Sequence, residues 1–367
     1  MARELQHLYL HIAQLHLEGD KALTKQYHSP KVLELVKENN RLIGYILSKY
    51  DETTLKENID FFYYILWFLG NSHSYIISST TDDVRSEIFS CLRFVLKEWI
   101  PDSEKYVIVC SQGDFAFRTF YLNGIDFYDQ IECYLQFQYA IRMIPINMPF
   151  YMQSDFMFNA ALYHEIGHFV DHYHRIIESI IEEEKNGNIA IPQVDVYLKD
   201  MTEDKAKNVN EYYTQLTSYL KEYLADLFAA RYTGKSIFYY LRYVTPDGKA
   251  DKGHPSSACR EMMVDEFLGD SAKYGELLKL LLSNTKDMKD NPLRPCTLNT
   301  DISSFVSLSE CDKPASNEHV HSIIPNLWDI WNNRRYEFKG NDGTPMGFID
   351  IYKNLMELSA KTVQKLQ

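Results

Sequence analysis

Aliphatic residues recur with helical spacing near the start of the chain: Leu5, Leu8, Ile12 and Leu15. Side chains at this spacing lie on one face of a helix. A continuous apolar run at 61–69 is typical of a buried core helix, and good N-cap residues at 80–83 precede a further helical pattern that continues to Trp99. These patterns predict a helical N-terminal lobe over residues 1–103.

Downstream of this lobe the pattern changes to β-prone runs. Residues 106–110 and 115–121 read as two strands separated by a turn signal. Residues 134–144 read as another strand, and 144–149 as an edge strand, because proline is tolerated only at an edge or a bulge. An exposed edge strand could hold an extended peptide by backbone hydrogen bonds.

Helical patterns then return for most of the remaining chain. One predicted helix runs from about 155 to about 187, and a second runs from 209 to 232 and is ended by Gly234. The C-terminal part alternates polar loops with helical patterns at 270–282 and 351–366. The predicted fold is α+β and mostly helical, with the edge of a small sheet packed on the first long helix.

The chain of 367 residues is long enough for a sizeable core with additional lobes. Hydrophobic residues make up 45% and charged residues 24%, which is an ordinary globular composition. We expect three parts: a helical N-terminal lobe at 1–103, a core at 104–268 that contains the sheet and both long helices, and a helical C-terminal region at 269–367.

Charge and apolar content exclude some classes of partner. The net charge of −13, without a basic stripe, argues against binding of nucleic acid. The N-terminus lacks the apolar core of a signal peptide, and the longest apolar run is about half the length that spans a bilayer. The six cysteines are scattered and form no Cys-x-x-Cys pair. We therefore expect a cytoplasmic protein without a membrane span.

The most informative stretch is His164-Glu165-Ile166-Gly167-His168, set within an apolar helical pattern. His164 and His168 are four residues apart, so a helix directs both imidazoles to one side, where they could bind one metal ion. Zinc suits two imidazoles and leaves a position open for water. Glu165 would then lie beside the metal as a general base. The alternative is a helix with solvated surface histidines, but polar groups in an apolar element need partners.

A catalytic zinc site of this kind needs a third protein ligand. Glu222 and Asp226 lie four residues apart in a helix rich in apolar residues, so one carboxylate could ligate zinc while the other fixes a histidine ring. His174 is the competing candidate, because it follows His164 at the spacing of the longer metzincin motif. That motif has a glycine where this chain has Asp171, so we expect the helix to continue and to carry His174 away.

The two histidines of the motif and the Glu222-to-Asp226 helix together resemble a gluzincin metallopeptidase. That resemblance implies that Glu222 is the third zinc ligand and that Asp226 orients His164. The segment from His254 to Arg260 is similar to one near the metal in minigluzincin and CAAX-type peptidases. It implies that His254 contacts the oxyanion or the substrate and that Arg260 pairs with a carboxylate. The resemblance covers about residues 140–265, and a prenylated substrate is not implied because transmembrane helices are lacking.

These inferences together predict a zinc-dependent endopeptidase that cleaves a protein or peptide bound in extended form. His254 or a nearby tyrosine such as Tyr223 would donate to the oxyanion. The helical lobes could also bind a regulatory protein partner. Two alternatives remain open: a catalytically silent metallopeptidase-like binding protein, and a metzincin-like site that uses His174. A further alternative is an all-helical interaction protein that binds no metal, in which the His-Glu-x-x-His motif occurs by chance.

Overall fold

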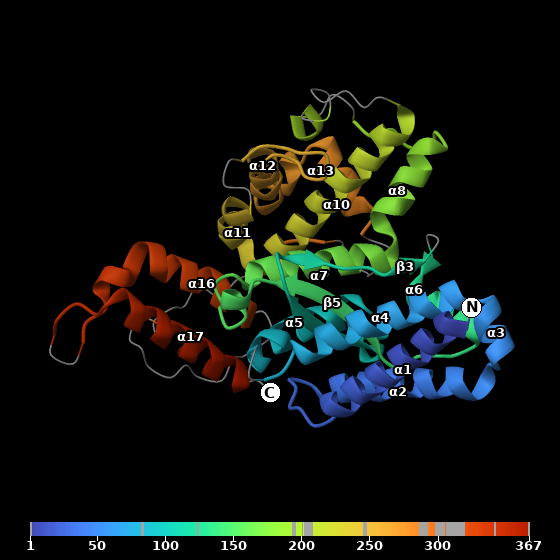
Figure 1. The fold of residues 1–367 in the computed structure, drawn as a ribbon. Helices are drawn as coiled ribbons and strands as arrows, with labels where there is room; N and C mark the ends of the chain where they lie inside the picture. The colour runs from blue at the N-terminus through green and yellow to red at the C-terminus, as the bar shows by residue number, and fades with distance from the viewer. Residues whose placement is uncertain are drawn as a thin grey trace. The chain divides into compact units, whose positions relative to one another are not determined.

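The computed structural model describes residues 2–81, 84–122, 125–192, 196–199, 201, 208–244, 248–285, 293–297, 305, 320–340 and 343–365 (Figure 1). The predicted class is confirmed, because helices dominate and are accompanied by a small mixed sheet. The chain divides into two compact units, one made of Met1–Phe89 and Asp102–Ser154, the other of Ser90–Pro101 and Asp155–Gln367. The three-part division by function remains a prediction. Within the described ranges, no helix is long and apolar enough to cross a membrane.

The helices of the first unit are α1 (Ala2–Ala22), α2 (Pro30–Lys49), α3 (Glu52–Glu57), α4 (Ile59–Ile77) and the short α6 (Phe127–Gln130). Of these, α1 and α4 lie where the aliphatic spacing and the apolar run predict helices, whereas α6 lies in the region predicted to form strands and turns. Helix α1 packs against α2 and α4, with Leu5, Leu8 and Ile12 buried as their spacing predicts. Helix α2 starts where the Ser29 hydroxyl accepts a hydrogen bond from the Lys31 backbone N–H at 3.3 Å. Short 3₁₀ turns lie at η1 (Ser103–Lys105) and η3 (Phe150–Met152).

One buried histidine in α4 makes the stability of this unit depend on pH. The side chain of His73 is 3% exposed, and neither of its ring nitrogens has a hydrogen-bond partner. Burial lowers the pKa of His73 to about 4, and the charge of Glu18 opposes this only in part. The unfolded chain therefore binds a proton at His73 below about pH 6.5, whereas the folded unit binds it only near pH 4.

We expect the free energy of unfolding of wild type to fall, relative to His73→Leu, by about 3 kcal/mol between pH 7 and pH 4. The leucine removes the titrating group and the unpaired ring nitrogens, so it also stabilises the unit at pH 7. Urea titrations of both proteins at the two pH values measure the difference. An equal loss of stability in both would assign the acid sensitivity to other groups.

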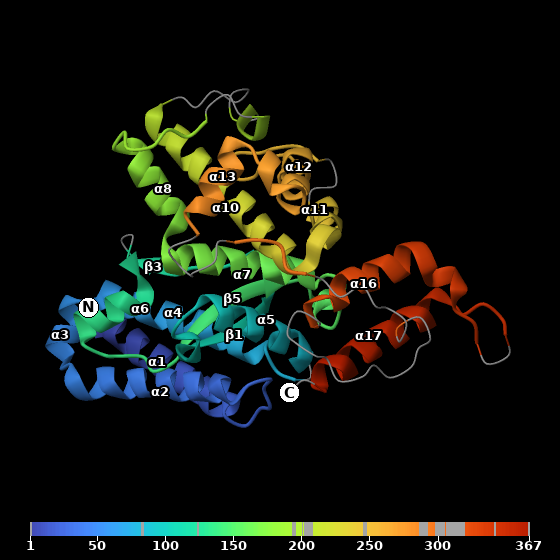
Figure 2. The same cartoon turned by 180° about the vertical axis from the view of Figure 1, so that it is seen from behind.

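The sheet of the first unit has three strands in the order β1-β5-β2. Figure 2 shows β1 beside β5. Strand β1 (Tyr106–Gln112) pairs in parallel with β5 (Arg142–Met148), and β2 (Ala116–Phe117) pairs antiparallel with β5. A separate two-stranded ladder joins β3 (Tyr121–Leu122) to β4 (Ile125–Asp126). The sheet belongs to the first unit and the motif helix to the second, so the packing of a sheet edge on that helix stays a prediction.

The predicted edge position of the proline-containing strand is wrong, because β5 is the central strand. Pro145 is tolerated there because β2 is very short and pairs only with Ile146 and Asn147. Beyond that pairing, the Pro145 carbonyl accepts a hydrogen bond from the Arg118 N–H at 3.0 Å, so the missing proline N–H costs at most the reciprocal bond just past the end of β2.

The prediction of a strand over 134–144 is also wrong in its first half. Residues Ile131–Leu135 form a π-helical turn, η2, and Gln136 follows with a left-handed backbone at φ 56°. The Leu135 carbonyl accepts hydrogen bonds from Tyr45 and Lys49 of α2. Local β propensity is therefore overridden by contacts with α2, and the strand begins only at Arg142.

The second unit is helical, and α5 (Ser86–Trp99) enters it from the first. Its long helices are α7 (Asn159–His174), α8 (Ile176–Lys185), α10 (Val209–Thr233), α12 (Ser257–Leu268) and α17 (Phe348–Gln364). Shorter helices are α11 (Ile237–Val244), α13 (Glu276–Ser283) and α16 (Ile323–Asp329). Single turns are η4 (Val196–Leu198), η5 (Gly234–Ser236), η6 (Ser271–Lys273), the π-helical η8 (Ile330–Arg334) and η9 (Arg335–Glu337).

The motif helix ends earlier than predicted. The prediction of one continuous helix to about residue 187 is wrong, because α7 and α8 are separate helices. Arg175 takes a left-handed conformation at φ 53° and separates α7 from α8. The break is supported by Asp171, whose carboxylate accepts a hydrogen bond from the Ile177 N–H at 2.8 Å in the first turn of α8. Asp171, which stands where the metzincin motif has a glycine, therefore stabilises the first turn of α8.

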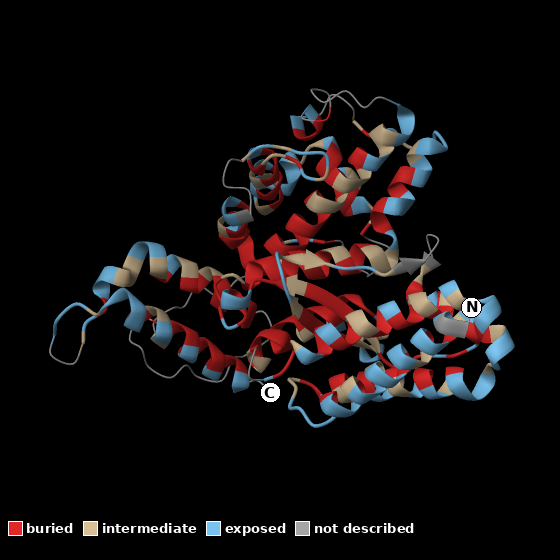
Figure 3. Cartoon of the chain, in the orientation of Figure 1, coloured by how far each residue is buried: buried red, intermediate tan, exposed pale blue. Residues whose placement is uncertain are grey.

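Helices α7 and α10 pack closely, and both are buried along much of their length (Figure 3). The two helices approach each other closely at Gly167 of the motif. A Cβ atom at Gly167 would lie 2.9 Å from the Ala225 Cα and 3.2 Å from the Ala225 carbonyl oxygen. Both are backbone atoms of α10, so a larger residue at 167 would have to push the two helices apart.

We therefore expect Gly167→Ala to destabilise the protein by about 1–3 kcal/mol despite the higher helix propensity of alanine. Gly44→Ala in α2 is the matched control, because a Cβ there meets nothing within 4 Å. That control should be neutral or more stable by up to about 1 kcal/mol. Denaturant unfolding of both variants tests the difference, and equal stabilities would refute the tight contact at Gly167.

Candidate metal centre

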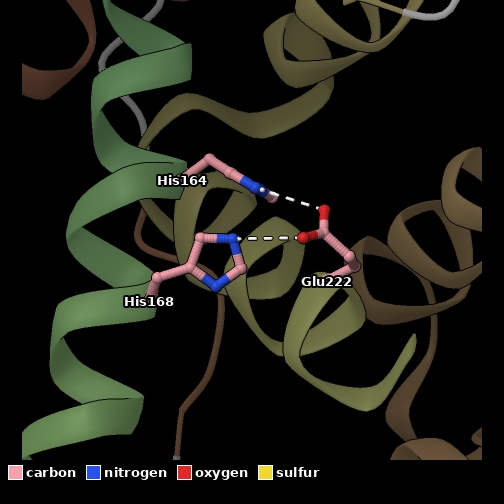
Figure 4. A group of neighbouring side chains, drawn as sticks. All are labelled: His164, His168 and Glu222. Atoms are coloured by element: carbon pink, nitrogen blue, oxygen red, sulfur yellow. Dashed lines mark ion pairs between the residues drawn. The ribbon is translucent and has the colours of Figure 1, made fainter. Parts of the chain in front are cut away.

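Three side chains from α7 and α10 converge in the second unit. His164 and His168 come from α7 and Glu222 from α10, and one ligand atom from each lies within 4.8 Å of the others (Figure 4). The His164 Nε2 is 3.5 Å from Glu222 Oε2, and the His168 Nε2 is 3.3 Å from Glu222 Oε1. Ligand atoms about 2.0–2.1 Å from a tetrahedral zinc lie about 3.4 Å apart. The distances therefore suit a metal ion of this kind.

Asp226 holds the ring of His164 through Nδ1, the ring nitrogen that does not face Glu222. Its Oδ1 is 2.9 Å from His164 Nδ1, and the Asp226 side chain is fully buried. This contact sets Nδ1–H as the donor to the carboxylate and leaves Nε2 directed to Glu222. One helical turn between Glu222 and Asp226 places both carboxylates against the same imidazole.

Arg260 of α12 pairs with both carboxylates and offsets one of their two negative charges. Its Nε donates to Asp226 Oδ2 at 2.6 Å, and its Nη2 donates to Asp226 Oδ1 at 2.7 Å. The same Nη2 lies 3.1 Å from Glu222 Oε2. The Arg260 side chain is 2% exposed, so these contacts occur in a low-dielectric environment where they are strong. The carboxylate pairing that the resemblance implied for Arg260 is therefore made with Asp226 and Glu222.

The pKa values of His164, Glu222 and Asp226 favour the binding of a cation at this site. Burial acts to raise the pKa of Glu222 and of Asp226, but the charge of Arg260 and the histidine contacts outweigh it and hold both pKa values below their usual range. Burial acts to lower the pKa of His164, but its hydrogen bonds with Asp226 and Glu222 raise that pKa to about 10. The carboxylates therefore stay ionised, and the His164 imidazole holds a proton that a metal ion would have to displace.

Glu165 lies beside the three converging side chains and is not one of them. It is 2% exposed, and the Tyr240 hydroxyl of α11 is 3.4 Å from its Oε1. The Tyr240 ring also approaches the His164 ring, with centroids 5.5 Å apart. Burial, together with the charge of Glu165, raises the pKa of Tyr240 well above its ordinary value, so the phenol keeps its proton.

Sequence reasoning missed Tyr240. It is one of 27 tyrosines, and it has no fixed spacing from the motif. Its position depends on the turn at Gly234–Ser236, which directs α11 back toward α7. The helical pattern of α11 could have indicated a buried tyrosine, but nothing in the sequence links it to Glu165.

His254 lies at the edge of the centre, on the segment before α12. Its Nε2 is 3.9 Å from Glu222 Oε1, and its Nδ1 is 3.1 Å from Asp251 Oδ1. The same Asp251 carboxylate accepts hydrogen bonds from the backbone N–H groups of Gly253 and His254 at 2.6 and 2.7 Å. Asp251, which sequence reasoning also missed, therefore holds the ring of His254 with Nε2 toward the metal-binding side chains.

The remaining two candidates are placed differently. The Tyr223 hydroxyl donates to the Tyr197 carbonyl at 2.6 Å, so this buried group already has an acceptor. His174 is at the last residue of α7, and its Nε2 is 2.9 Å from the Trp99 carbonyl oxygen. In the described part of the chain, His174 is not among the residues that could share a metal ion.

Comparisons with known proteins add nothing to this geometry. No protein-family model matches the chain, and neither a curated protein nor a solved structure does. The fold and the site define a mostly helical α+β protein in which two histidines and a glutamate could hold a metal ion.

Proposed function

We propose that this protein is a zinc-dependent endopeptidase of the gluzincin type. The observation that carries the proposal is the convergence of His164, His168 and Glu222, with Glu165 buried beside them. Two imidazoles and one carboxylate form a donor set used by catalytic zinc sites, which keep one position open. A purely structural site usually has four protein ligands and needs no neighbouring base.

His164, His168 and Glu222 would hold the zinc ion, which would supply a Lewis acid that activates water for attack on a carbonyl. Glu165 takes the proton of the attacking water and delivers it to the leaving amine. Its buried carboxylate is kept in place beside the Tyr240 hydroxyl. This proton transfer is the step that distinguishes a peptidase from a metal-binding protein with the same ligands.

We propose that two groups stabilise negative charge on the substrate oxygen. The His254 Nε2 faces the metal-binding side chains because Asp251 holds the opposite ring nitrogen. The protonated hydroxyl of Tyr240 is the second donor. Tyr223 is less suited than Tyr240, because its hydroxyl donates to a backbone carbonyl at 2.6 Å, whereas the Tyr240 hydroxyl makes only a longer contact of 3.4 Å with Glu165. Asp226 and Arg260 act as positioning residues, since they hold His164 and Glu222.

We propose that the substrate is a protein or peptide bound in an extended conformation. The resemblance to gluzincins supports this class of substrate, and the described helices give no support to a membrane-embedded one. The catalytically silent alternative would bind zinc through the same residues and would cleave nothing.

Zinc stoichiometry tests the proposal directly. Wild type is expected to bind about one zinc ion per chain, because a catalytic site of this type holds one metal with three protein ligands. Glu222→Ala should weaken zinc binding by more than about 100-fold, since even residues that only support a ligand typically contribute about 10–100-fold. His174→Ala should retain zinc, because His174 contacts the Trp99 carbonyl.

Elemental analysis after dialysis against a weak chelator gives the result for all three proteins. Loss of zinc only in His174→Ala would establish the metzincin-like alternative. A wild-type protein that binds no zinc would exclude the peptidase.

A further inference from the structure

The first unit contains a second candidate site, a cavity of about 570 Å³ with aromatic walls. Tyr50 follows α2, Phe61, Phe62 and Tyr64 lie on α4, and Tyr134 belongs to the π-helical turn η2. The volume is in the range of sites that bind small molecules. None of these residues belongs to the candidate metal centre, so the cavity is a separate feature of the protein.

The rings in the wall are tilted against one another. Tyr50 and Phe62 have centroids 5.3 Å apart with an interplanar angle of 62°, and Phe61 and Tyr134 are 5.8 Å apart at 57°. Phe61 and Phe62 also meet at 62°. Rings at such angles present their faces in several directions and do not close into a flat stack. Ring faces carry the negative part of the aromatic quadrupole, which attracts cations.

The charged side chains near the cavity also favour the binding of a cation. Asp60 is the one charged side chain among the described residues that line the wall. The surrounding segment, residues 49–60, contains four carboxylates and two lysines, so it is negative overall. One of these lysines, Lys49, is held by the Tyr45 hydroxyl and the Leu135 carbonyl, and its Nζ lies 5.7 Å from the Tyr50 ring centroid. Lys49 therefore occupies one side of the Tyr50 ring, and the four carboxylates of this segment outweigh the charges of its two lysines.

We propose that this cavity binds a small organic cation, namely a methylated ammonium compound with an apolar body. A primary ammonium needs several hydrogen-bond acceptors when it leaves water, whereas five of the ten residues in the wall are aromatic and the polar ones are Thr54, Asn58, Asp60 and Gln130. A methylated ammonium is covered by apolar methyl groups and gains from contact with ring faces. The cavity is larger than such a head group, so an apolar body fills the remaining space, and Asp60 balances the charge.

Two probes of equal shape isolate the charge. They are (4-hydroxyphenyl)trimethylammonium and its neutral analogue 4-tert-butylphenol, titrated calorimetrically into the full-length protein at pH 6.5 and low salt. We expect the cation to bind at least about 10-fold more tightly than the neutral analogue, since one desolvated cation–π contact contributes about that much. Equal affinity of the two probes, or no binding of the cation, would overturn the proposal.

Three variants locate the binding. Tyr134→Ala removes a ring that is 64% exposed at the rim, so the fold is retained and affinity for the cation should fall about 5-fold or more. Asp60→Asn should weaken the cation severalfold and leave the neutral analogue unchanged. Glu57→Gln is the control, because it removes the same charge from a nearby exposed residue outside the wall. Binding that neither Tyr134→Ala nor Asp60→Asn weakens would place the cation elsewhere and refute this site.

Discussion

Replacing Glu165 with glutamine is expected to leave zinc bound and to reduce peptide hydrolysis by about 10³-fold or more. The amide has almost the same shape, but it cannot accept a proton from water, and general-base catalysis contributes about 10²–10⁴-fold. Zinc should remain because Glu165 is not among the residues that could share a metal ion. The measurement combines zinc content per chain with cleavage rates on a peptide library for wild type and variant.

The exposed Glu34 provides the matched control for this substitution. Glu34→Gln makes the same chemical change on the surface of α2 and should alter neither zinc content nor cleavage. A zinc-loaded Glu165→Gln protein with wild-type activity would exclude Glu165 as the base. Loss of zinc together with activity would show instead that Glu165 supports the ligands.

The second large effect is expected at Arg260. Arg260→Met leaves the buried carboxylates of Asp226 and Glu222 without their cation, and breaking such a pair typically costs about 3–5 kcal/mol. For a unit of this size that is a fall in Tm on the order of 10 °C. Because a bound metal cation would replace part of the missing positive charge, added zinc should restore part of the loss.

Arg242→Met is the control variant, because it removes an ion pair at the surface instead of a buried one. Arg242 pairs with Glu261 on the surface, and its side chain is 62% exposed, so its removal should cost less than about 1 kcal/mol. Thermal melts of both variants with chelator and with zinc make the comparison. Equal melting temperatures would mean that Arg260 contributes no more than a surface arginine, and a zinc-independent loss would separate it from the metal centre.

The parts of the site that the sequence predicts are those that one helix presents on one face. His164 and His168 lie a single helical turn apart on α7, and Glu222 and Asp226 a single turn apart on α10. Such pairs are recognisable because helical geometry relates residues four apart wherever the helix lies. The meeting of the two pairs was inferred from the chemistry of zinc, and the structure places them within ligand distance.

Tyr240 and Asp251 could not be found in this way. Tyr240 reaches Glu165 through the packing of α11, and Asp251 reaches His254 through a tight turn. Neither relation is periodic. Both depend on the path of the chain between elements, which spacing alone does not describe.

The errors in the fold have the same origin. The sequence predicts an edge position for Pro145 because its missing N–H disfavours a central position, but the short β2 ends before that residue. The end of the motif helix at Arg175 depends on a hydrogen bond from Ile177 to Asp171, which crosses the break. In each case a partner outside the local pattern decided the structure.

The contact at Gly167 has a consequence for which ions the centre could accommodate. Two ligands are on α7 and one is on α10, so the separation of the two helix axes sets the size of the space between the ligand atoms. At Gly167 that separation is limited by backbone atoms, which cannot change rotamer as a side chain can. Ion radius is therefore coupled to helix packing, because the backbone contact sets a lower limit on this separation, and an ion that needed shorter bonds could not draw the two helices closer together.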